Sequence, residues 1–110
     1  MKTLTIIPVL LFSLLLGAPS YTDDYSKALY AFSKGDYATG LEIFKSLAEK
    51  GDANAQFGLG YMYHMGDFGV SQDYKEAVRL YILAAEQGKV GAQYNLGRLY
   101  AQGEGVPQDD

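Results

Sequence analysis

Residues 55–63 read AQFGLGYMY and residues 92–100 read AQYNLGRLY, so Ala, Gln, Leu, Gly and Tyr recur 37 positions apart. The agreement continues backward, where YATGLEIFKSLAEKGDANA (37–55) aligns with YKEAVRLYILAAEQGKVGA (74–92) at the same spacing. It continues forward once Phe68 is set aside, because GVSQD (69–73) then aligns with GVPQD (105–109). Self-similarity of this length indicates a repeat protein, in which each unit buries its apolar side against the next.

The stretch 74–88 predicts the second helix of a unit. Its apolar residues have the i, i+3, i+4, i+7, i+8 spacing of one buried helical face, at Ala77, Leu80, Tyr81, Ala84 and Ala85. Asp73 is the predicted N-cap, Glu76 completes a capping box, and Gly88 follows the last turn, where a left-handed residue is common. Asp36 and Gly51 occupy the equivalent positions one unit earlier.

First helices are predicted over 53–64 and 90–101, and a leading helix over 23–33. In the helix over 53–64 the residues predicted to point inward are Ala55, Leu59, Met62 and Tyr63. Tyr81 and Tyr100 are predicted to lie in the core as well. The units are expected over about 22–51, 52–88 and 89–110, and the third of these is incomplete.

The glycines of the opening stretch raise the alternative of a phosphate-binding loop. No strand precedes them and no Lys followed by Ser or Thr comes after them, so the requirements of such a loop are not met. Gly60 and Gly97 fall inside predicted helices, where glycine costs about 1 kcal/mol relative to alanine. Their recurrence predicts that a neighbouring helix approaches closely at both positions. The others are predicted to serve tight turns, at Gly66, Gly69, Gly103 and Gly105.

The first 20 residues have the layout of a secretory signal peptide. Lys2 is followed by an apolar run over 4–16, and Ala18 and Ser20 are small residues suited to cleavage before Tyr21. The run is shorter than the roughly 20 apolar residues that a membrane-spanning helix needs. We therefore expect a repeat domain over 21–110, located in the periplasm or secreted, with no stable membrane span after cleavage.

The composition of the chain excludes several classes of partner and of catalytic group. The chain has 110 residues, a formal net charge of −4 and no cysteine. An acidic chain without a basic cluster repels phosphate backbones, so nucleic acid is not expected as a partner. The absence of cysteine excludes disulfides and a thiol catalyst. No cofactor or metal is predicted.

The repeated units resemble the Sel1-like repeat family, relatives of the tetratricopeptide repeat. The resemblance rests on the pattern A-x-x-x-L-G-x-[ML]-Y-x-x-G-x-G-V-x-x-D followed by A-x-x-x-[YF]-x-x-A-A-E-x-G, which begins at Ala55 and starts again at Ala92. It implies an all-α fold, a right-handed α-α superhelix (solenoid) of stacked helix-turn-helix units. It also implies a non-enzymatic adaptor that binds another protein, as in exported bacterial members. Phe68 departs from the pattern by lengthening one turn.

Enzymatic function is the alternative from another class, either as a cell-wall or as a β-lactam hydrolase. The single histidine, His64, is predicted to be an exposed residue at a helix end, and no serine lies near it in sequence. Adjacent acids such as Asp23 and Asp24 point apart on a helix, whereas paired carboxylate catalysis needs convergence. An inhibitor or immunity role remains open beside the envelope scaffold.

Tyr61 is predicted to face outward, and Arg98 is its equivalent one unit later. Tyr and Arg are enriched at binding hot spots. The predicted partner-facing surface consists of Gln56, Tyr61, His64, Met65, Gln93, Arg98 and Gln102.

Asp109 aligns with the cap Asp73, and the helix that it would open is not in the sequence. The helix over 90–101 is therefore expected to leave Leu96, Leu99 and Tyr100 partly uncovered. Three outcomes follow from this expectation: the chain is a fragment of a longer array, its last helix frays, or the uncapped helix associates with another chain, including end-to-end self-association.

Overall fold

The structure, a computed structural model, describes residues 21–105. Within this range the chain forms helices and no strand, so the predicted all-α class is confirmed. The predicted signal peptide and residues 106–110 lie outside the described part. The elements are α2 (Tyr21–Ser33), α3 (Tyr37–Glu49), α4 (Ala53–Met65), α5 (Tyr74–Glu86) and α6 (Val90–Gln102).

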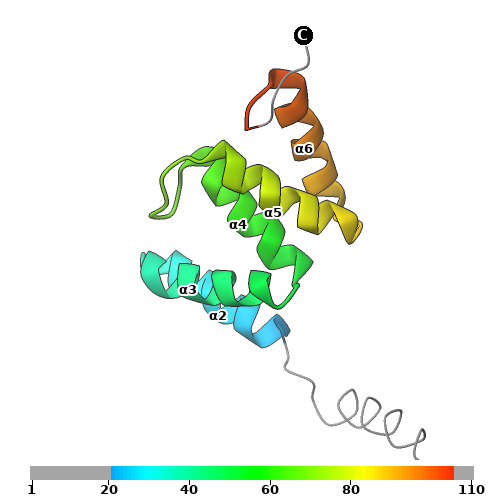
Figure 1. Cartoon of the computed structure of the whole chain (residues 1–110). Coiled ribbons are helices and arrows are strands. Elements are labelled where there is room, and N and C mark those ends of the chain that lie inside the picture. Colours follow the sequence, from blue (N-terminus) through cyan, green and yellow to red (C-terminus); the bar gives the residue numbers. More distant parts are fainter. Residues whose placement is uncertain (1–20, 106–110) are drawn as a thin grey trace, which may run out of the picture.

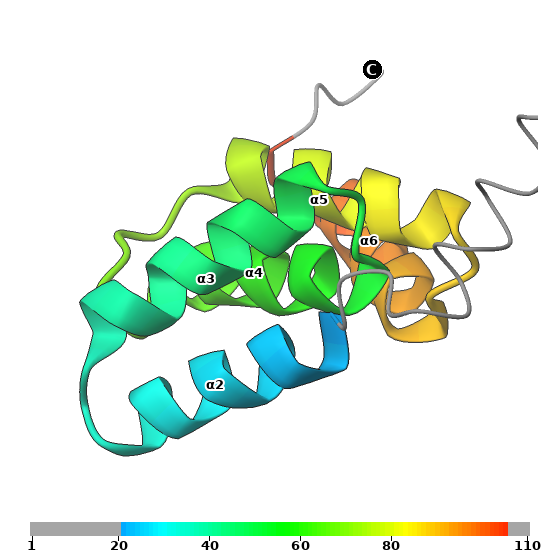
Figure 2. The same cartoon turned by 90° about the horizontal axis from the view of Figure 1, so that it is seen from below.

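The helices stack in chain order, each packing mainly on those before and after it. Helices α2 and α3 form one antiparallel pair, α4 and α5 form the next, and α6 lies at the far end of the stack (Figure 1 and, turned by 90°, Figure 2). This arrangement is that of a helical repeat solenoid. The right-handed sense of its superhelix stays a prediction.

Aspartates begin three of the helices. Asp52 accepts hydrogen bonds from the N–H groups of Asn54 and Ala55, at 2.9 and 3.4 Å. The predicted caps Asp36 and Asp73 are confirmed, because each accepts a hydrogen bond from the N–H three residues later. The full capping box is wrong: the carboxylate of Glu76 does not return to the N–H of Asp73, because it receives hydrogen bonds from Arg79. The N–H of Asp73 instead donates to the carbonyl of Tyr63.

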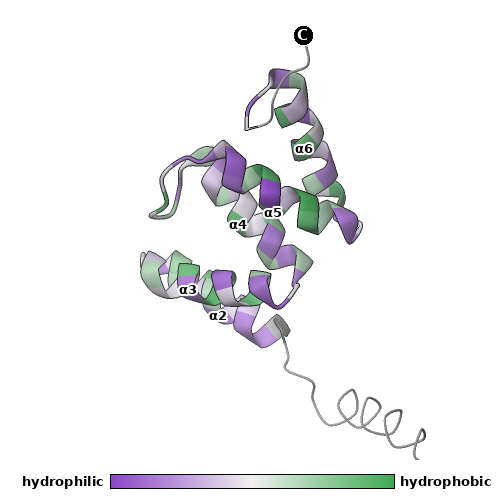
Figure 3. Cartoon of the chain, viewed as in Figure 1, coloured by the Kyte–Doolittle hydropathy of each residue, from purple (hydrophilic) through white to green (hydrophobic). Residues whose placement is uncertain are grey.

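Each helix buries one face, and apolar and polar residues accordingly alternate along the ribbon in Figure 3. One core cluster joins the first pair to α4 around Phe32, Phe44 and Leu59. A second cluster joins α5 to α6 around Tyr81 and Leu99. Because the helices contribute to neighbouring clusters in turn, the stack has a continuous core.

The predicted inward positions of α4 and α5 are mostly confirmed, including Leu59, which is 3% exposed, and Tyr81, which is 0% exposed. In α6, Leu96 and Tyr100 are partly uncovered, as expected from the missing next helix, but the uncovered position expected for Leu99 and the core position expected for Tyr100 are wrong. Leu99 is completely buried, because it points towards the cluster around Tyr81, whereas Tyr100 is 47% exposed. Tyr100 follows Leu99 by one residue, which turns its side chain about 100° around the helix and away from α5.

Gly60 and Gly97, which were both predicted to be crowded, differ in the space around them. A Cβ added at Gly60 would lie 2.9 Å from a ring carbon of Tyr81, so crowding there is confirmed, although the neighbour is a side chain rather than a backbone. At Gly97 the prediction is wrong, because an added Cβ would meet nothing within 4 Å. No described helix covers that side of α6.

The turn between α4 and α5 contains an unusual residue. Phe68 has a positive φ of 56°, which is rare for a bulky side chain. Its ring lies edge-on to Phe32 and Tyr37, with centroids 5.4 and 5.6 Å apart. The extra residue therefore ties the longer turn back onto the first helix pair.

Candidate protein-interaction surface

Five of the seven residues predicted to face a partner are exposed on the first helices of units, and Gln93 is one of them. Tyr61 and Met65 lie four residues apart on α4 and are 43% and 51% exposed. Arg98 and Gln102 are their equivalents on α6 and are also exposed. Residues at i and i+4 share one helical face. Their exposure meets the requirement for partner contact, and the contact itself stays a prediction.

Gln56 does not belong to this surface, because it is only 4% exposed. Its Nε2 donates to the carbonyl of Ala48 at 3.1 Å, and its Oε1 accepts from Nε2 of Gln87 at 2.8 Å. Gln93, one unit later, repeats the first contact by donating to the carbonyl of Ala85 at 3.1 Å. The repeated glutamine thus ties the start of a first helix to the end of the preceding second helix.

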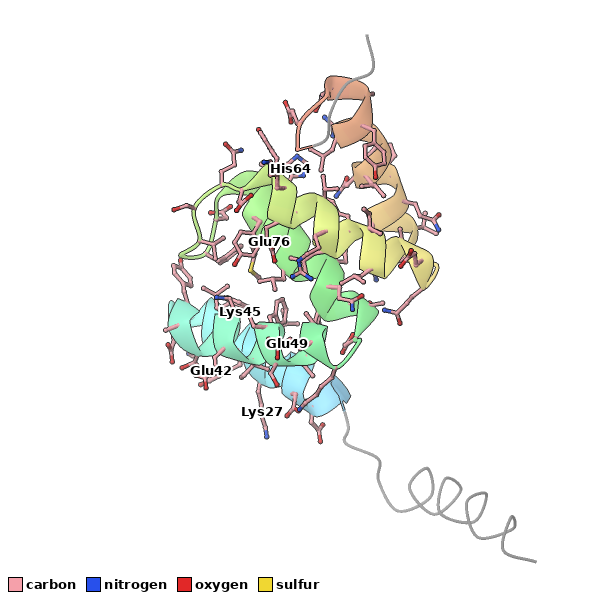
Figure 4. The ribbon with its side chains drawn as sticks, viewed as in Figure 1. Lys27, Glu42, Lys45, Glu49, His64 and Glu76 are labelled. Atoms are coloured by element: carbon pink, nitrogen blue, oxygen red, sulfur yellow. The ribbon has the colours of Figure 1, made fainter. Side chains whose placement is uncertain are left out.

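His64 is half-buried rather than exposed, so this prediction is wrong as well. Its Nδ1 lies 3.2 Å from the hydroxyl of Tyr81, to which Asn95 donates from 3.3 Å. Its ring lies edge-on to those of Tyr74 and Tyr81. His64 is labelled in Figure 4 where α4 meets the start of α5. The histidine therefore links three helices.

The hydroxyl of Tyr81 is neutral at physiological pH. Burial raises the pKa of Tyr81 to about 12, and the hydrogen bond from Asn95 opposes that rise. The neutral phenol of Tyr81 and the imidazole of His64 form a structural hydrogen bond. This pair contains no serine or cysteine nucleophile for the histidine to activate.

Aromatic rings with cations over them are features that sequence reasoning missed. Nζ of Lys34 lies 5.4 Å from the ring centroid of Tyr30, and Cζ of Arg98 lies 6.0 Å from that of Tyr94. Nζ of Lys89 lies 5.5 Å from the ring centroid of Phe57. The available signal was the spacing i, i+4 between Tyr30 and Lys34 and between Tyr94 and Arg98.

Two of these residues, Tyr30 and Arg98, occupy the same position in their helices as Tyr61 does in α4. Tyr30, Tyr61 and Arg98 each lie five positions before the positive-φ glycine that follows their helix. We call the surface that they define the first-helix face. It comprises Tyr30 on α2 and Lys34 just after it, Phe57, Tyr61 and Met65 on α4, Lys89 just before α6, and Tyr94, Arg98 and Gln102 on α6.

A cavity of about 480 Å³ opens between α3 and α5, with α4 as its floor. Lys45 and Glu49 line it from α3, and Glu76 and Arg79 line it from α5. Glu76 and Arg79 form an ion pair with each other. Figure 4 labels Lys45, Glu49 and Glu76 around this gap. The lining offers charges and an apolar floor but no serine, threonine, cysteine or histidine.

Neither a metal-binding cluster nor a helix able to cross a membrane occurs within residues 21–105. No group of three or more His, Cys, Asp or Glu residues is arranged there to hold a metal ion. None of the helices in this part of the chain has the length and apolar character needed to cross a membrane.

Comparison with known proteins identifies the repeat. A sequence model described as Sel1 repeat matches residues 53–89 and 90–110, which together make up more than half of the chain. Comparison with curated proteins gives no match. Among solved structures, a Sel1 repeat protein from Oxalobacter formigenes is 33% identical, with a TM-score of 0.73 over 83% of this chain and 71% of that chain. The chain belongs to the Sel1 repeat family.

Proposed function

We propose that this chain is an exported, non-enzymatic adaptor that binds another protein through the first-helix face. Sel1 repeats generally mediate protein–protein interactions. The observation that carries the proposal is the exposure of large aromatic side chains along the first-helix face. Tyr30 and Tyr94 are each 66% exposed, and Tyr61 is 43% exposed. Tyrosine offers a rigid apolar body with a polar tip, which suits it to anchoring a partner.

Export is the second part of the proposal, and its support comes from sequence alone. Lys2, the apolar run over 4–16 and the small residues Ala18 and Ser20 fit a cleaved signal. Mass spectrometry of the chain recovered from a periplasmic or culture fraction tests this directly. A product beginning at Tyr21 supports export, and a chain that retains residues 1–20 in the cytoplasm contradicts it.

The adaptor function is tested by affinity capture from an envelope extract. The Tyr61→Ala, Arg98→Ala double variant removes an aromatic anchor and its cationic equivalent on the next unit. The matched control is Glu42→Ala, Lys75→Ala, which changes two exposed residues on α3 and α5. Circular dichroism of both variants is the check that they remain folded.

We expect proteins captured by the unmodified chain to be lost with the first double variant and kept with the control. If both variants capture the same proteins as the unmodified chain, the first-helix face is not the binding surface and the proposal fails.

A further inference from the structure

Acidic residues are absent from two of the helices that carry the first-helix face. Neither α4, with the sequence ANAQFGLGYMYHM, nor α6, with VGAQYNLGRLYAQ, contains Asp or Glu. The chain as a whole is acidic, with 13 Asp and Glu against 9 Lys and Arg. The described acids lie on α2, α3 and α5, in the turns between helices, and at Glu104 just after α6. This segregation leaves the α4 and α6 part of the face locally positive.

The cations of the face have no carboxylate partner. Within residues 21–105 the one ion pair closer than 4 Å joins Arg79 to Glu76, on α5. Lys34, Lys89 and Arg98 lie over aromatic rings instead. A ring holds a cation in place without neutralising its charge. These side chains are thus positioned and still able to pair with an incoming anion.

Lys89 stands where the preceding unit has a helix cap. It is 37 positions after Asp52, whose carboxylate caps α4, and α6 has no side-chain hydrogen bond at its start. Replacing an aspartate cap costs about 1 kcal/mol of helix stability. Nζ of Lys89 is held by Oδ1 of Asn54 at 2.7 Å and by the ring of Phe57. A stability loss accompanied by a positioned charge is typical of a residue retained for function.

We propose that the first-helix face takes an acidic segment of a partner protein, an inference that rests on the proposed function. Carboxylates of the segment pair with Lys89 and Arg98, and its apolar side chains lie against the exposed rings of Tyr61 and Tyr94. A guanidinium already stacked on a ring binds a carboxylate through two parallel hydrogen bonds with less loss of freedom. The surrounding acidic surfaces repel the same segment elsewhere, which confines it to this face.

A protein segment fits better than a polyanion such as a lipid surface or a nucleic acid. Three separated cations on a chain of net charge −4 provide little attraction for a dense array of phosphates. The exposed rings between them add apolar contact area, which a peptide with alternating acidic and apolar side chains satisfies.

The test is selection of linear 12-residue peptides, displayed on phage, by the purified chain. Two double charge reversals with the same change in net charge are compared with it. Lys89→Glu, Arg98→Glu reverses the face, and Lys45→Glu, Lys75→Glu reverses exposed lysines on α3 and α5. We expect selected peptides rich in Asp and Glu, whose affinity falls by about tenfold or more with the first double variant and little with the second. Their binding should also weaken as salt rises.

Other results overturn the inference. Selected peptides that are neutral or basic, equal weakening by both double variants, or no enrichment would each reject an acidic segment. Vesicles of phosphatidylglycerol that bind the chain, with the same loss on reversal and no peptide enrichment, would assign the face to lipid headgroups. Capture of proteins that depends on Tyr61 would leave the adaptor function standing in any of these cases.

Discussion

At the scale of single residues, aromatic rings lie over most of the helical glycines. Five glycines lie inside the described helices, and a Cβ added at four of them would approach a ring within 3.0 Å. The pairs are Gly40 with Phe32, Gly58 with Phe44, Gly60 with Tyr81 and Gly91 with Phe57. Gly97 is the exception, with nothing within 4 Å. Glycine thus leaves space for an aromatic ring at four positions, which explains why its lower helix propensity is tolerated there. At Gly97 no ring is present, and the structure does not explain the glycine.

Gly60→Ala and Gly97→Ala should change stability in opposite directions. Alanine gains about 1 kcal/mol of helix propensity at either position. At Gly60 the new methyl group meets the fully buried ring of Tyr81, and overpacking of this kind costs about 1–3 kcal/mol. We expect Gly60→Ala to lower the free energy of unfolding in urea and Gly97→Ala to raise it. A rise at both positions would show that the Tyr81 ring moves aside.

Gln56→Ala should cost more than Gln93→Ala. Both glutamines donate to the carbonyl eight residues earlier, but Gln56 is buried and also accepts from Gln87. Leaving buried polar groups unsatisfied costs about 1–3 kcal/mol, whereas water replaces an exposed partner. Urea unfolding of the two variants measures the difference. Equal costs would mean that burial of Gln56 adds nothing to the shared hydrogen bond.

At the scale of residues, the sequence predicted a side chain's role correctly where its contacts lie within its own helix. It failed where the contacts come from another helix. The caps Asp36 and Asp73 were predictable because they act on their own helix. The prediction of Gln56 as a partner contact is wrong, and its recurrence as Gln93 was the sign of a structural hydrogen bond. The crowding of Gly97 was inferred by register from Gly60, but register does not supply the covering ring.

At the scale of helices, the sequence predicted the positions well. The helix expected over 53–64 spans Ala53–Met65, and the one expected over 90–101 spans Val90–Gln102. The leading helix begins two residues earlier than the predicted 23–33. Apolar periodicity and capping residues fix these bounds locally. The role of Phe68 was not predictable, because its ring packs on Phe32 and Tyr37 of the preceding unit.

Lys89→Asp should stabilise α6 relative to Lys89→Ala. Both variants lose the contacts of Lys89 with Asn54 and Phe57, but only aspartate provides a cap for the first N–H groups of the helix, as Asp52 does for α4. A cap of this kind contributes about 1 kcal/mol. Urea unfolding of the two variants gives the difference directly. Equal stability would show that the start of α6 cannot adopt the capped geometry of α4.

The buried phenol of Tyr81 should make the packing of α4, α5 and α6 sensitive to alkali. Its pKa is about 12 in the folded chain and about 10 when unfolded, so the folded state holds the proton more tightly. This contribution to stability is complete below pH 10 and is lost as the pH rises to about 12. Tyr81→Phe should flatten the fall in melting temperature over that window. Some loss should remain, because burial, aided by the charge of Asp52, also raises the pKa of Tyr25.

At the scale of the whole molecule, the repeat alone specified the class and order of the stack, because each unit contacts chiefly its neighbours. The interaction surface was only partly predictable. Exposure of Tyr61 and Arg98 follows from helical register, whereas the position of Lys89 over the ring of Phe57 depends on how α4 packs beside the start of α6, which the sequence does not reveal. The overall charge of −4 concealed the local absence of acids on α4 and α6.

Adding a helix that covers the exposed side of α6 would test whether the stack continues by the same packing that joins α5 to α4. A copy of residues 74–88 attached after Asp109 would follow the register in which Asp73 precedes α5. The tyrosine copied from Tyr81 should then lie over Gly97, as Tyr81 lies over Gly60. Burying this ring and part of Tyr100, which is 47% exposed, stabilises by about 1.5–3 kcal/mol for each large side chain. Thermal unfolding should therefore show a gain of several degrees.

The control is the same extension with alanine in place of the tyrosine copied from Tyr81, which should lose most of the gain. Leu replacing Gly97 in the extended chain should do the same, because its side chain would occupy the space for the ring. Sedimentation velocity then tests whether α6 mediates end-to-end self-association, which stays a prediction, since a covered α6 leaves no apolar face for a second copy. An extension that adds no stability, with or without the tyrosine, would mean that α6 does not accept a second helix in the manner of α4, and that the stack does not propagate by register.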